Sequence, residues 1–261
     1  MPNIEQHPAG NFAWFELSTS DTAGAKQFYS SLLGWDAQDS PMGPDMMYTM
    51  FRLNGRDAAG AYVMKPEDRQ LGIPPNWLLY IAVDDADATV AHSLEHGGSA
   101  MSPAFDIPNV GRMAVLQDPV GAIVAIFQPG NHRGAGIYGE NNAFCWADLE
   151  TPDRDRSMRF YGPVFTWKFL PGKDKDATGY LHIVNGEQYI GGFPEPRNLP
   201  PSVVPHWLPY IQCADCAAQT TKVKELGGSI IVPATTVEGQ LNYSVVADPQ
   251  GAVFALFQPA H

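Results

Sequence analysis

The stretch FAWFELSTSDTAGAKQFYSSLLGW, from Phe12 to Trp35, decides the fold because the chain repeats it as FCWADLETPDRDRSMRFYGPVFTW, from Phe144 to Trp167. Each copy begins with residues that alternate with period two, which is typical of a strand. Apolar residues then follow at the i, i+3, i+4, i+7 spacing of an amphipathic helix. The sequence therefore predicts a strand and a helix at both places.

The two faces of the first strand have different roles in this prediction. If the helix covers Phe15 and Leu17, then Trp14 and Glu16 lie on the face without a helix. The second copy again places an acidic residue, Asp148, on that face. A carboxylate in a dry core is costly, so we expect this face to form a partly wet cleft.

A second repeated unit begins at Asn76 and recurs at His206, and a single offset of 130 residues relates the two. Asp118 and Gly121 in the turn between its last two strands correspond to Asp248 and Gly251. All four units read as a strand, a helix and three strands. We expect an α+β fold of four tandem βαβββ units that pair into two domains, with a cleft between paired units.

The predicted domains are 12–130 and 143–261, after an N-terminal arm at 1–11 and with a glycine-rich linker at 131–142. Within the first domain we expect a loop at 36–44, a hairpin turned by Asn54-Gly55, a linker at 65–75 and a helix at 85–96.

Composition excludes several classes of function. The formal net charge is -12, which disfavours binding to nucleic acid. No apolar run is long enough to span a membrane, and the first residues lack a signal peptide's apolar region. Three cysteines are too few for a disulfide framework, so we expect a cytoplasmic protein, either a monomer or a homodimer.

Taken together, these motifs resemble the vicinal oxygen chelate superfamily, which includes glyoxalase I, the bleomycin-resistance proteins and the extradiol dioxygenases. The motifs are Trp14–Asp21, Leu33-Gly34-Trp35, Pro75–Asp85, Gly111-Arg112-Met113 and Asp118–Gln128. The resemblance runs from residue 11 to residue 259 and is closest to two-domain bacterial glyoxalase-like proteins. It implies glyoxalase/bleomycin-resistance-like domains with cupped mixed sheets.

The resemblance also shows where metal ligands are expected. Metal-dependent members carry His or Gln in the first strand of a unit and Glu in the last strand. Here the first-strand positions hold Trp14, Leu78, Trp146 and Leu208, and the last-strand positions hold Ala125 and Ala255. Indole and alkyl groups offer no metal donor, so we expect neither a metal nor another cofactor in the clefts.

We expect a carboxylate–tyrosine pair in each cleft, with Tyr80 opposite Glu16 and Tyr210 opposite Asp148. Each pair is either an ordinary buried hydrogen bond or a group that orients a ligand, with proton transfer as a further possibility. Glu16, Asp148 and His182 are the candidates for catalysis. The candidates for ligand binding are Trp14, Glu16, Tyr48, Met50, Tyr80, Met113, Val115, Ala125, Trp146, Asp148, Tyr210, Tyr243, Val245 and Ala255.

Two other patterns have a structural as well as a functional interpretation. His92-Ser93-Leu94-Glu95-His96 matches an H-x-x-E-H zinc pattern, but histidines near a helix C-terminus are also favoured by the helix dipole. Cys213-Ala214-Asp215-Cys216 is a lone C-x-x-C whose counterpart is apolar at both cysteine positions, which favours small-residue packing.

The sequence thus predicts a metal-independent protein that binds a small apolar or aromatic molecule, for resistance or detoxification. The alternative is a metal-dependent glyoxalase-like lyase or isomerase, or a dioxygenase, with non-standard ligands such as Glu150, His182 or His206. A third interpretation is an inert interaction protein whose own aromatic side chains fill the clefts.

Overall fold

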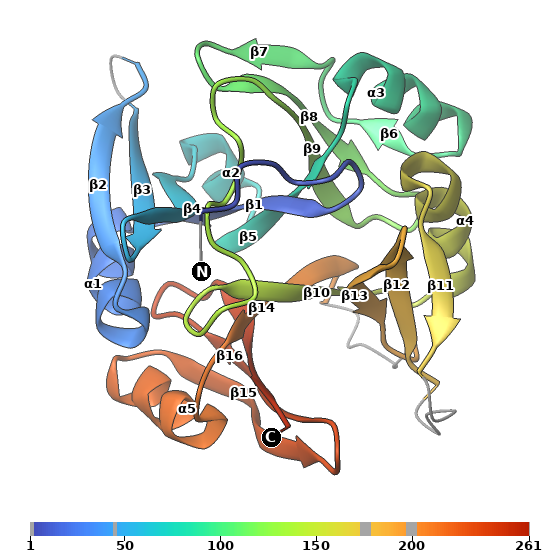
Figure 1. The fold of residues 1–261 in the computed structure, drawn as a ribbon. Helices are drawn as coiled ribbons and strands as arrows, with labels where there is room; N and C mark the ends of the chain where they lie inside the picture. Colours follow the sequence, from blue (N-terminus) through green and yellow to red (C-terminus); the bar gives the residue numbers. More distant parts are fainter. Residues whose placement is uncertain (1–2, 44–45, 173–178, 197–202, 261) are drawn as a thin grey trace.

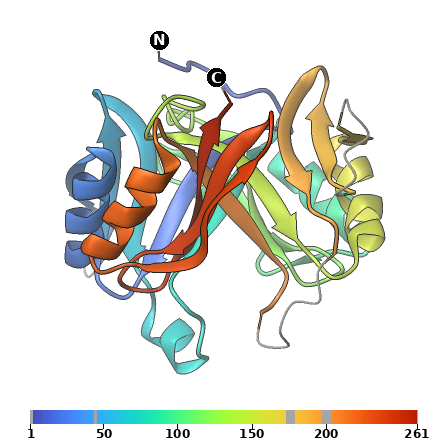
Figure 2. The same ribbon diagram turned by 90° about the horizontal axis from the view of Figure 1, so that it is seen from below.

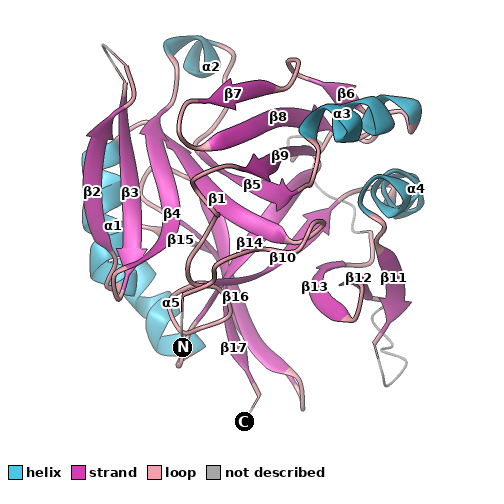
Figure 3. Ribbon diagram, turned by 45° about the horizontal axis from the view of Figure 1, so that its top comes forward, coloured by secondary structure: helices cyan, strands magenta, loops and turns pink. Residues whose placement is uncertain are grey.

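The computed structural model describes residues 3–43, 46–172, 179–196 and 203–260. The chain forms two mixed β-sheets with helices on their outer sides (Figures 1 and 3). Among the described residues, no helix is long and apolar enough to cross a membrane.

The first sheet is built from the first two units. Its order is β2-β3-β4-β1-β5-β9-β8-β6, and β7 pairs with β8. Its strands are β1 (Phe12–Thr19), β2 (Asp36–Pro41), β3 (Met47–Leu53), β4 (Arg56–Val63), β5 (Asn76–Ala82), β6 (Ser99–Ala100), β7 (Phe105–Ile107), β8 (Gly111–Gln117) and β9 (Ile123–Pro129). The helices of this half are α1 (Thr22–Leu33), α2 (Pro66–Gln70) and α3 (Ala86–Glu95).

The second sheet repeats this order as β11-β12-β13-β10-β14-β17-β16-β15. Its strands are β10 (Phe144–Glu150), β11 (Lys168–Pro171), β12 (Leu181–Asn185), β13 (Gln188–Phe193), β14 (His206–Gln212), β15 (Ser229–Val237), β16 (Leu241–Ala247) and β17 (Val253–Pro259). The helices of this half are α4 (Arg154–Phe165) and α5 (Cys216–Glu225). The predicted α+β class and the two-domain repeat are confirmed, whereas the domain boundaries remain a prediction.

The helix ends follow from local chemistry. Asp21 accepts hydrogen bonds from the N–H groups of Ala23 and Gly24 and so caps α1. The helix ends at Gly34, whose φ of 73° is in the left-handed region. Thr166 takes the same conformation after α4 with φ 59°, although it is not glycine.

The helices pair across the two halves. α1 lies beside α5, and α3 lies beside α4 (Figure 2). The core between helices and sheets is also shared: Phe15 stacks on Phe144 with ring centroids 4.0 Å apart, and Phe12 contacts Trp207 at 5.3 Å. Each half therefore contributes an aromatic ring to the core of the other.

Three local expectations were wrong. The predicted loop at 36–44 contains the strand β2, whose residues are all exposed and give no apolar alternation. The linker at 65–75 contains the one-turn helix α2. In the β1–β5 register Tyr80 pairs with Trp14 rather than with Glu16, and Tyr210 likewise pairs with Trp146.

Candidate functional site

The helix-free face of the first sheet holds a cavity of about 140 Å³. Five of the predicted ligand-binding residues line it, together with five that the sequence did not indicate. The predicted ones are Trp14, Glu16, Tyr48, Met50 and Tyr80, and the others are Met42, Ile107, Val110, Phe127 and His132. We call this cavity the first cleft.

Glu16 is the acceptor at the centre of the first cleft. Tyr80 donates its hydroxyl hydrogen to Glu16 Oε2 over 2.6 Å, and Tyr48 donates to Oε1 over 2.8 Å. The Trp14 indole N–H in turn donates to the Tyr48 hydroxyl over 3.0 Å. The predicted Glu16–Tyr80 contact exists because a long tyrosine side chain reaches diagonally across two strands.

Burial determines which of the Glu16, Tyr48 and Tyr80 side chains can ionise. It raises the pKa of Glu16, and the hydrogen bonds from Tyr80 and Tyr48 only partly oppose that effect. Burial and the neighbouring carboxylate raise the pKa of both tyrosines well above the ordinary value, so both remain neutral donors. The site is therefore able to hold a polar ligand group by hydrogen bonds or to accept a proton.

The second half repeats the arrangement around Asp148. Tyr180 and Tyr210 donate to its two oxygens over 2.6 and 2.8 Å, and the Trp146 indole N–H donates to Oδ1 over 3.0 Å. Burial raises the pKa of Asp148 to about 6 despite these three donors. Tyr180 was not predicted, although it lies 132 residues after Tyr48, the offset that relates Trp14 to Trp146.

Two glycines make room for the tyrosines. A Cβ atom on Gly60 would overlap the Tyr48 hydroxyl, and one on Gly192 would overlap that of Tyr180. Gly60 and Gly192 are the register partners of Glu16 and Asp148 in the adjoining strands. Glycine at these positions is the sequence signal that would have identified both tyrosines.

Replacing Gly60 by alanine is therefore expected to displace Tyr48 from Glu16. Loss of this buried hydrogen bond should lower the free energy of unfolding by about 1–3 kcal/mol and raise the pKa of Glu16 further. Chemical denaturation and carboxyl NMR titration measure the two effects. Gly55→Ala is the control for the pKa, because a Cβ there meets no atom of the described residues within 4 Å. Unlike Gly60, Gly55 has a positive φ of 76°, so this control strains the backbone without touching Tyr48. An unchanged Glu16 pKa in the Gly60 variant would contradict the assignment.

His132 enters the first cleft from the linker. Its ring packs edge-on against Trp14 with centroids 4.7 Å apart, and burial lowers its pKa. Its Nδ1 accepts the Gly134 N–H over 3.4 Å, which leaves Nε2 as the protonated nitrogen. Nε2 has no hydrogen-bond partner in the described part of the chain and lies 3.8 Å from an oxygen of Asp57. The linker has no periodicity, so no sequence pattern indicated this histidine.

The other predicted residues lie around these groups. Met113 and Ala125 are buried and pack in one cluster with Trp14, Tyr80 and the partly buried Val115. In the second half, His182 contacts the Trp146 ring at 5.9 Å. Ala255 is the register partner of both Tyr210 and Val245, and Tyr243 is the partner of Phe257. Whether any of these residues binds a ligand remains a prediction.

The metal positions implied by the fold do not fit an ion. Trp14 and Ala125 are buried where donors are required, and Glu16, the one carboxylate among the described residues that line the first cleft, already accepts two tyrosine hydrogens. Glu150 and His206, considered as alternative ligands, pair across β10 and β14. The His206 Nδ1 bonds to the Val204 carbonyl oxygen.

The fold defines a class of protein: two tandem α+β domains, with a cavity on the helix-free face of the first sheet and a similar carboxylate–tyrosine group in the second half. The family model "Glyoxalase/Bleomycin resistance protein/Dioxygenase superfamily" matches residues 11–126 and 145–256. The chain belongs to this superfamily, as the resemblance of its motifs predicted.

Three similar proteins illustrate the range of the family. "Putative glyoxylase CFP32" of Mycobacterium tuberculosis is 36% identical over 100% of this chain and 99% of its own length. "Anthracycline biosynthesis protein DnrV" of Streptomyces peucetius is 30% identical, covering 94% of this chain and 92% of that protein. The Mn(II)-bound glyoxalase from Novosphingobium aromaticivorans superposes with a TM-score of 0.64 at 14% identity, over 99% of this chain and 83% of that one. The last similarity concerns the fold alone.

Proposed function

We propose that the chain is a metal-independent binding protein for a small aromatic molecule, which occupies the first cleft. The ring lies in the apolar part of the cleft beside Trp14, and a polar substituent bonds to the Glu16, Tyr48 and Tyr80 group. The observation that carries this proposal is a cavity with apolar walls and one buried carboxylate that is already held by two donors. A few placed polar groups in an apolar pocket are typical of small-molecule sites.

The size of the cavity sets the class of ligand. Its volume of about 140 Å³ is close to the roughly 150 Å³ of an engineered apolar cavity that binds benzene. A single substituted ring therefore fits without rearrangement. The relative DnrV is named an anthracycline biosynthesis protein, which is consistent with an aromatic ligand. A role in resistance or detoxification is consistent with sequestration of such a compound.

Trp14→Ala tests the proposal. The variant loses the ring that forms one wall of the cleft, so binding of a single-ring phenol or catechol should weaken by at least about tenfold, which corresponds to about 1.4 kcal/mol. Isothermal titration calorimetry over a panel of phenols, catechols and naphthoquinones measures this. Trp146→Ala is the matched variant in the second half and should leave binding in the first cleft unchanged.

Two results would overturn the proposal. One is that no member of the panel binds the wild-type protein. The other is equal binding by the wild type and the Trp14 variant, with the Trp14 variant still folded by circular dichroism. Loss of binding in the Trp146 variant alone would move the site to the second half.

The second candidate is a glyoxalase-like lyase or isomerase, favoured by the name of the relative CFP32. It requires a transition metal held by non-standard ligands of a cleft, such as Glu150, His182 or His206. The proposed binding function requires none there. A stoichiometric metal that is lost on His182→Ala would support the enzyme instead.

A further inference from the structure

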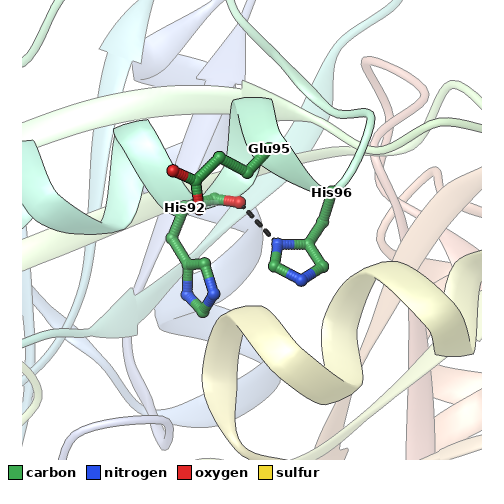
Figure 4. Close-up of side chains that lie close together, drawn as sticks. All are labelled: His92, Glu95 and His96. Carbon is green, nitrogen blue, oxygen red and sulfur yellow. Dashed lines mark hydrogen bonds between the residues drawn. The ribbon is translucent and has the colours of Figure 1, made fainter.

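A cluster of metal-ligating side chains lies away from both clefts, at the C-terminal end of α3. His92 and Glu95 belong to the last turn of the helix, and His96 is its C-cap (Figure 4). One ligand atom of each residue lies within 4.8 Å of the others. Among the described residues, this is the only group of three or more His, Cys, Asp or Glu side chains gathered so closely.

The distances suit a transition metal. Zinc binds histidine nitrogen and carboxylate oxygen at about 2.0–2.2 Å in a tetrahedron, so its ligand atoms lie about 3.3 Å apart. Glu95 is exposed and the two histidines are half-buried. Closing from 4.8 Å or less to that separation therefore needs only side-chain rotation, chiefly of Glu95.

A hydrogen bond prepares His96 as a ligand. Its Nδ1 lies 2.8 Å from the carbonyl oxygen of His92 (Figure 4). A carbonyl only accepts, so Nδ1 carries the hydrogen and Nε2 presents its lone pair. The same bond fixes the ring orientation, as second-shell bonds do in known metal sites.

The electrostatic surroundings also favour a cation. The last carbonyl groups of a helix carry partial negative charge, and the Glu95 carboxylate adds to it. An acidic side chain at this end of a helix is unfavourable unless a positive charge lies nearby. The dipole accounts for the two histidines alone. Glu95 has a counterpart in Glu225 of α5, but there Lys222 and Lys224 supply the positive charge.

A groove leaves room for a further ligand on the ion. His92 and Glu95 line a cavity of about 640 Å³, whose other side is formed by Val164–Thr166 at the end of α4. The cavity shares no lining residue with the first cleft. Three protein ligands with a fourth position open to a groove is the arrangement in which zinc keeps a water or binds a small ligand.

The corresponding turn of α5 shows that the fold does not need these histidines. It carries Lys222, Glu225 and Leu226 where α3 carries His92, Glu95 and His96. Both helices keep the same length and the same aspartate cap. We infer that His92, Glu95 and His96 form a site for one zinc-like divalent transition-metal ion, with an open coordination position facing the α3–α4 groove.

The test compares the wild type with His92→Lys/His96→Leu, which gives α3 the residues that α5 carries. Calorimetry with zinc chloride on the full, chelator-dialysed protein should show one equivalent bound by the wild type. The double variant should bind at least about 100-fold more weakly. Cobalt should give the wild type the intense visible bands of tetrahedral coordination, and the double variant should lack them. Zinc should also raise the melting temperature of the wild type only.

The outcomes are distinguishable. A wild type that binds no zinc overturns the inference, and so does a double variant that binds zinc as tightly as the wild type. In the latter case the ion lies elsewhere, for example at Cys213 and Cys216 or in a cleft. Glu95→Gln should show an intermediate affinity, and circular dichroism establishes that each variant is folded. The proposed aromatic site does not depend on this result.

Discussion

Replacing Asp248 by alanine is expected to lower the free energy of unfolding by about 3–5 kcal/mol. Asp248 is buried in the turn before β17, where its Oδ1 accepts the N–H groups of Gln250, Gly251 and Ala252. Its Oδ2 accepts the hydroxyl hydrogen of Tyr29 on α1, in the other half of the chain, over 3.0 Å. Alanine leaves the Gln250, Ala252 and Tyr29 donors without this acceptor, whereas the Gly251 N–H keeps its bond to the Asp248 main-chain carbonyl. A buried unpaired donor is costly.

The pseudo-symmetric residue Asp118 provides a matched variant. Its Oδ1 accepts three turn N–H groups, and its Oδ2 accepts from Ser157 on α4 over 3.1 Å. Asp118→Ala should therefore lower the free energy of unfolding by a similar amount. Tyr29→Phe removes the bond to Asp248 between the halves and also the acceptor of the Trp77 indole N–H, so the free energy of unfolding should fall by about 1–3 kcal/mol. Urea denaturation followed by tryptophan fluorescence measures all three.

These variants separate the turn from the contact between halves. If Asp248→Ala lowered the free energy of unfolding no more than Tyr29→Phe does, the turn N–H groups would be satisfied by water. The turn would then contribute little to stability. If Asp248→Ala lost less than about 1 kcal/mol, the buried acceptor would have no structural role. Because aromatic residues of each half pack in the core of the other, we expect one cooperative transition rather than two.

The repeat explains why so much of the fold was accessible from the sequence. Two copies of each unit allowed strand and helix limits to be compared, and the opposite faces of β1 were assigned correctly. Phe15 and Leu17 are buried in the shared core, whereas Trp14 packs on the helix-free face. The exposed strand β2 was missed because an edge strand with no buried residue has no apolar signal.

Residues of the candidate site were predicted only where they lie on strands that the sequence pattern indicated. The Glu16–Tyr80 and Asp148–Tyr210 contacts follow from equivalent positions in paired units. Their diagonal geometry depends on a strand register that no pattern specified. His132 lies in the linker, and its contact with Trp14 depends on how the chain crosses between halves. The local sequence of a segment without periodicity does not indicate where in the fold that segment lies.

Asp148→Asn is expected to change how stability depends on pH. Burial raises the pKa of this carboxyl from 3.8 to about 6 in the folded protein, and that rise corresponds to about 3 kcal/mol. Between these two values the folded chain keeps a proton that the unfolded chain has released. The contribution of Asp148 to stability is therefore complete below about pH 4, falls as the pH rises through about 6, and is constant above that.

Asparagine cannot ionise, so the variant does not undergo this loss. Its free energy of unfolding relative to the wild type should rise by about 2–3 kcal/mol between pH 4 and pH 7. Asparagine also changes the hydrogen bonds with Tyr180 and Tyr210, but that cost is nearly independent of pH. Urea denaturation at a series of pH values separates the pH-independent cost of the changed hydrogen bonds from the pH-dependent effect of removing the carboxyl.

Glu16→Gln is the matched variant in the first half, and its relative stability should change in the same direction because burial also raises the pKa of Glu16. A stability difference between Asp148→Asn and the wild type that is flat from pH 4 to pH 7 would show that the carboxyl ionises as readily in the folded chain as in the unfolded one. A buried carboxylate that ionises readily would require a nearby cation or water in the second half. The three donors from Trp146, Tyr180 and Tyr210 would then be insufficient to describe that site.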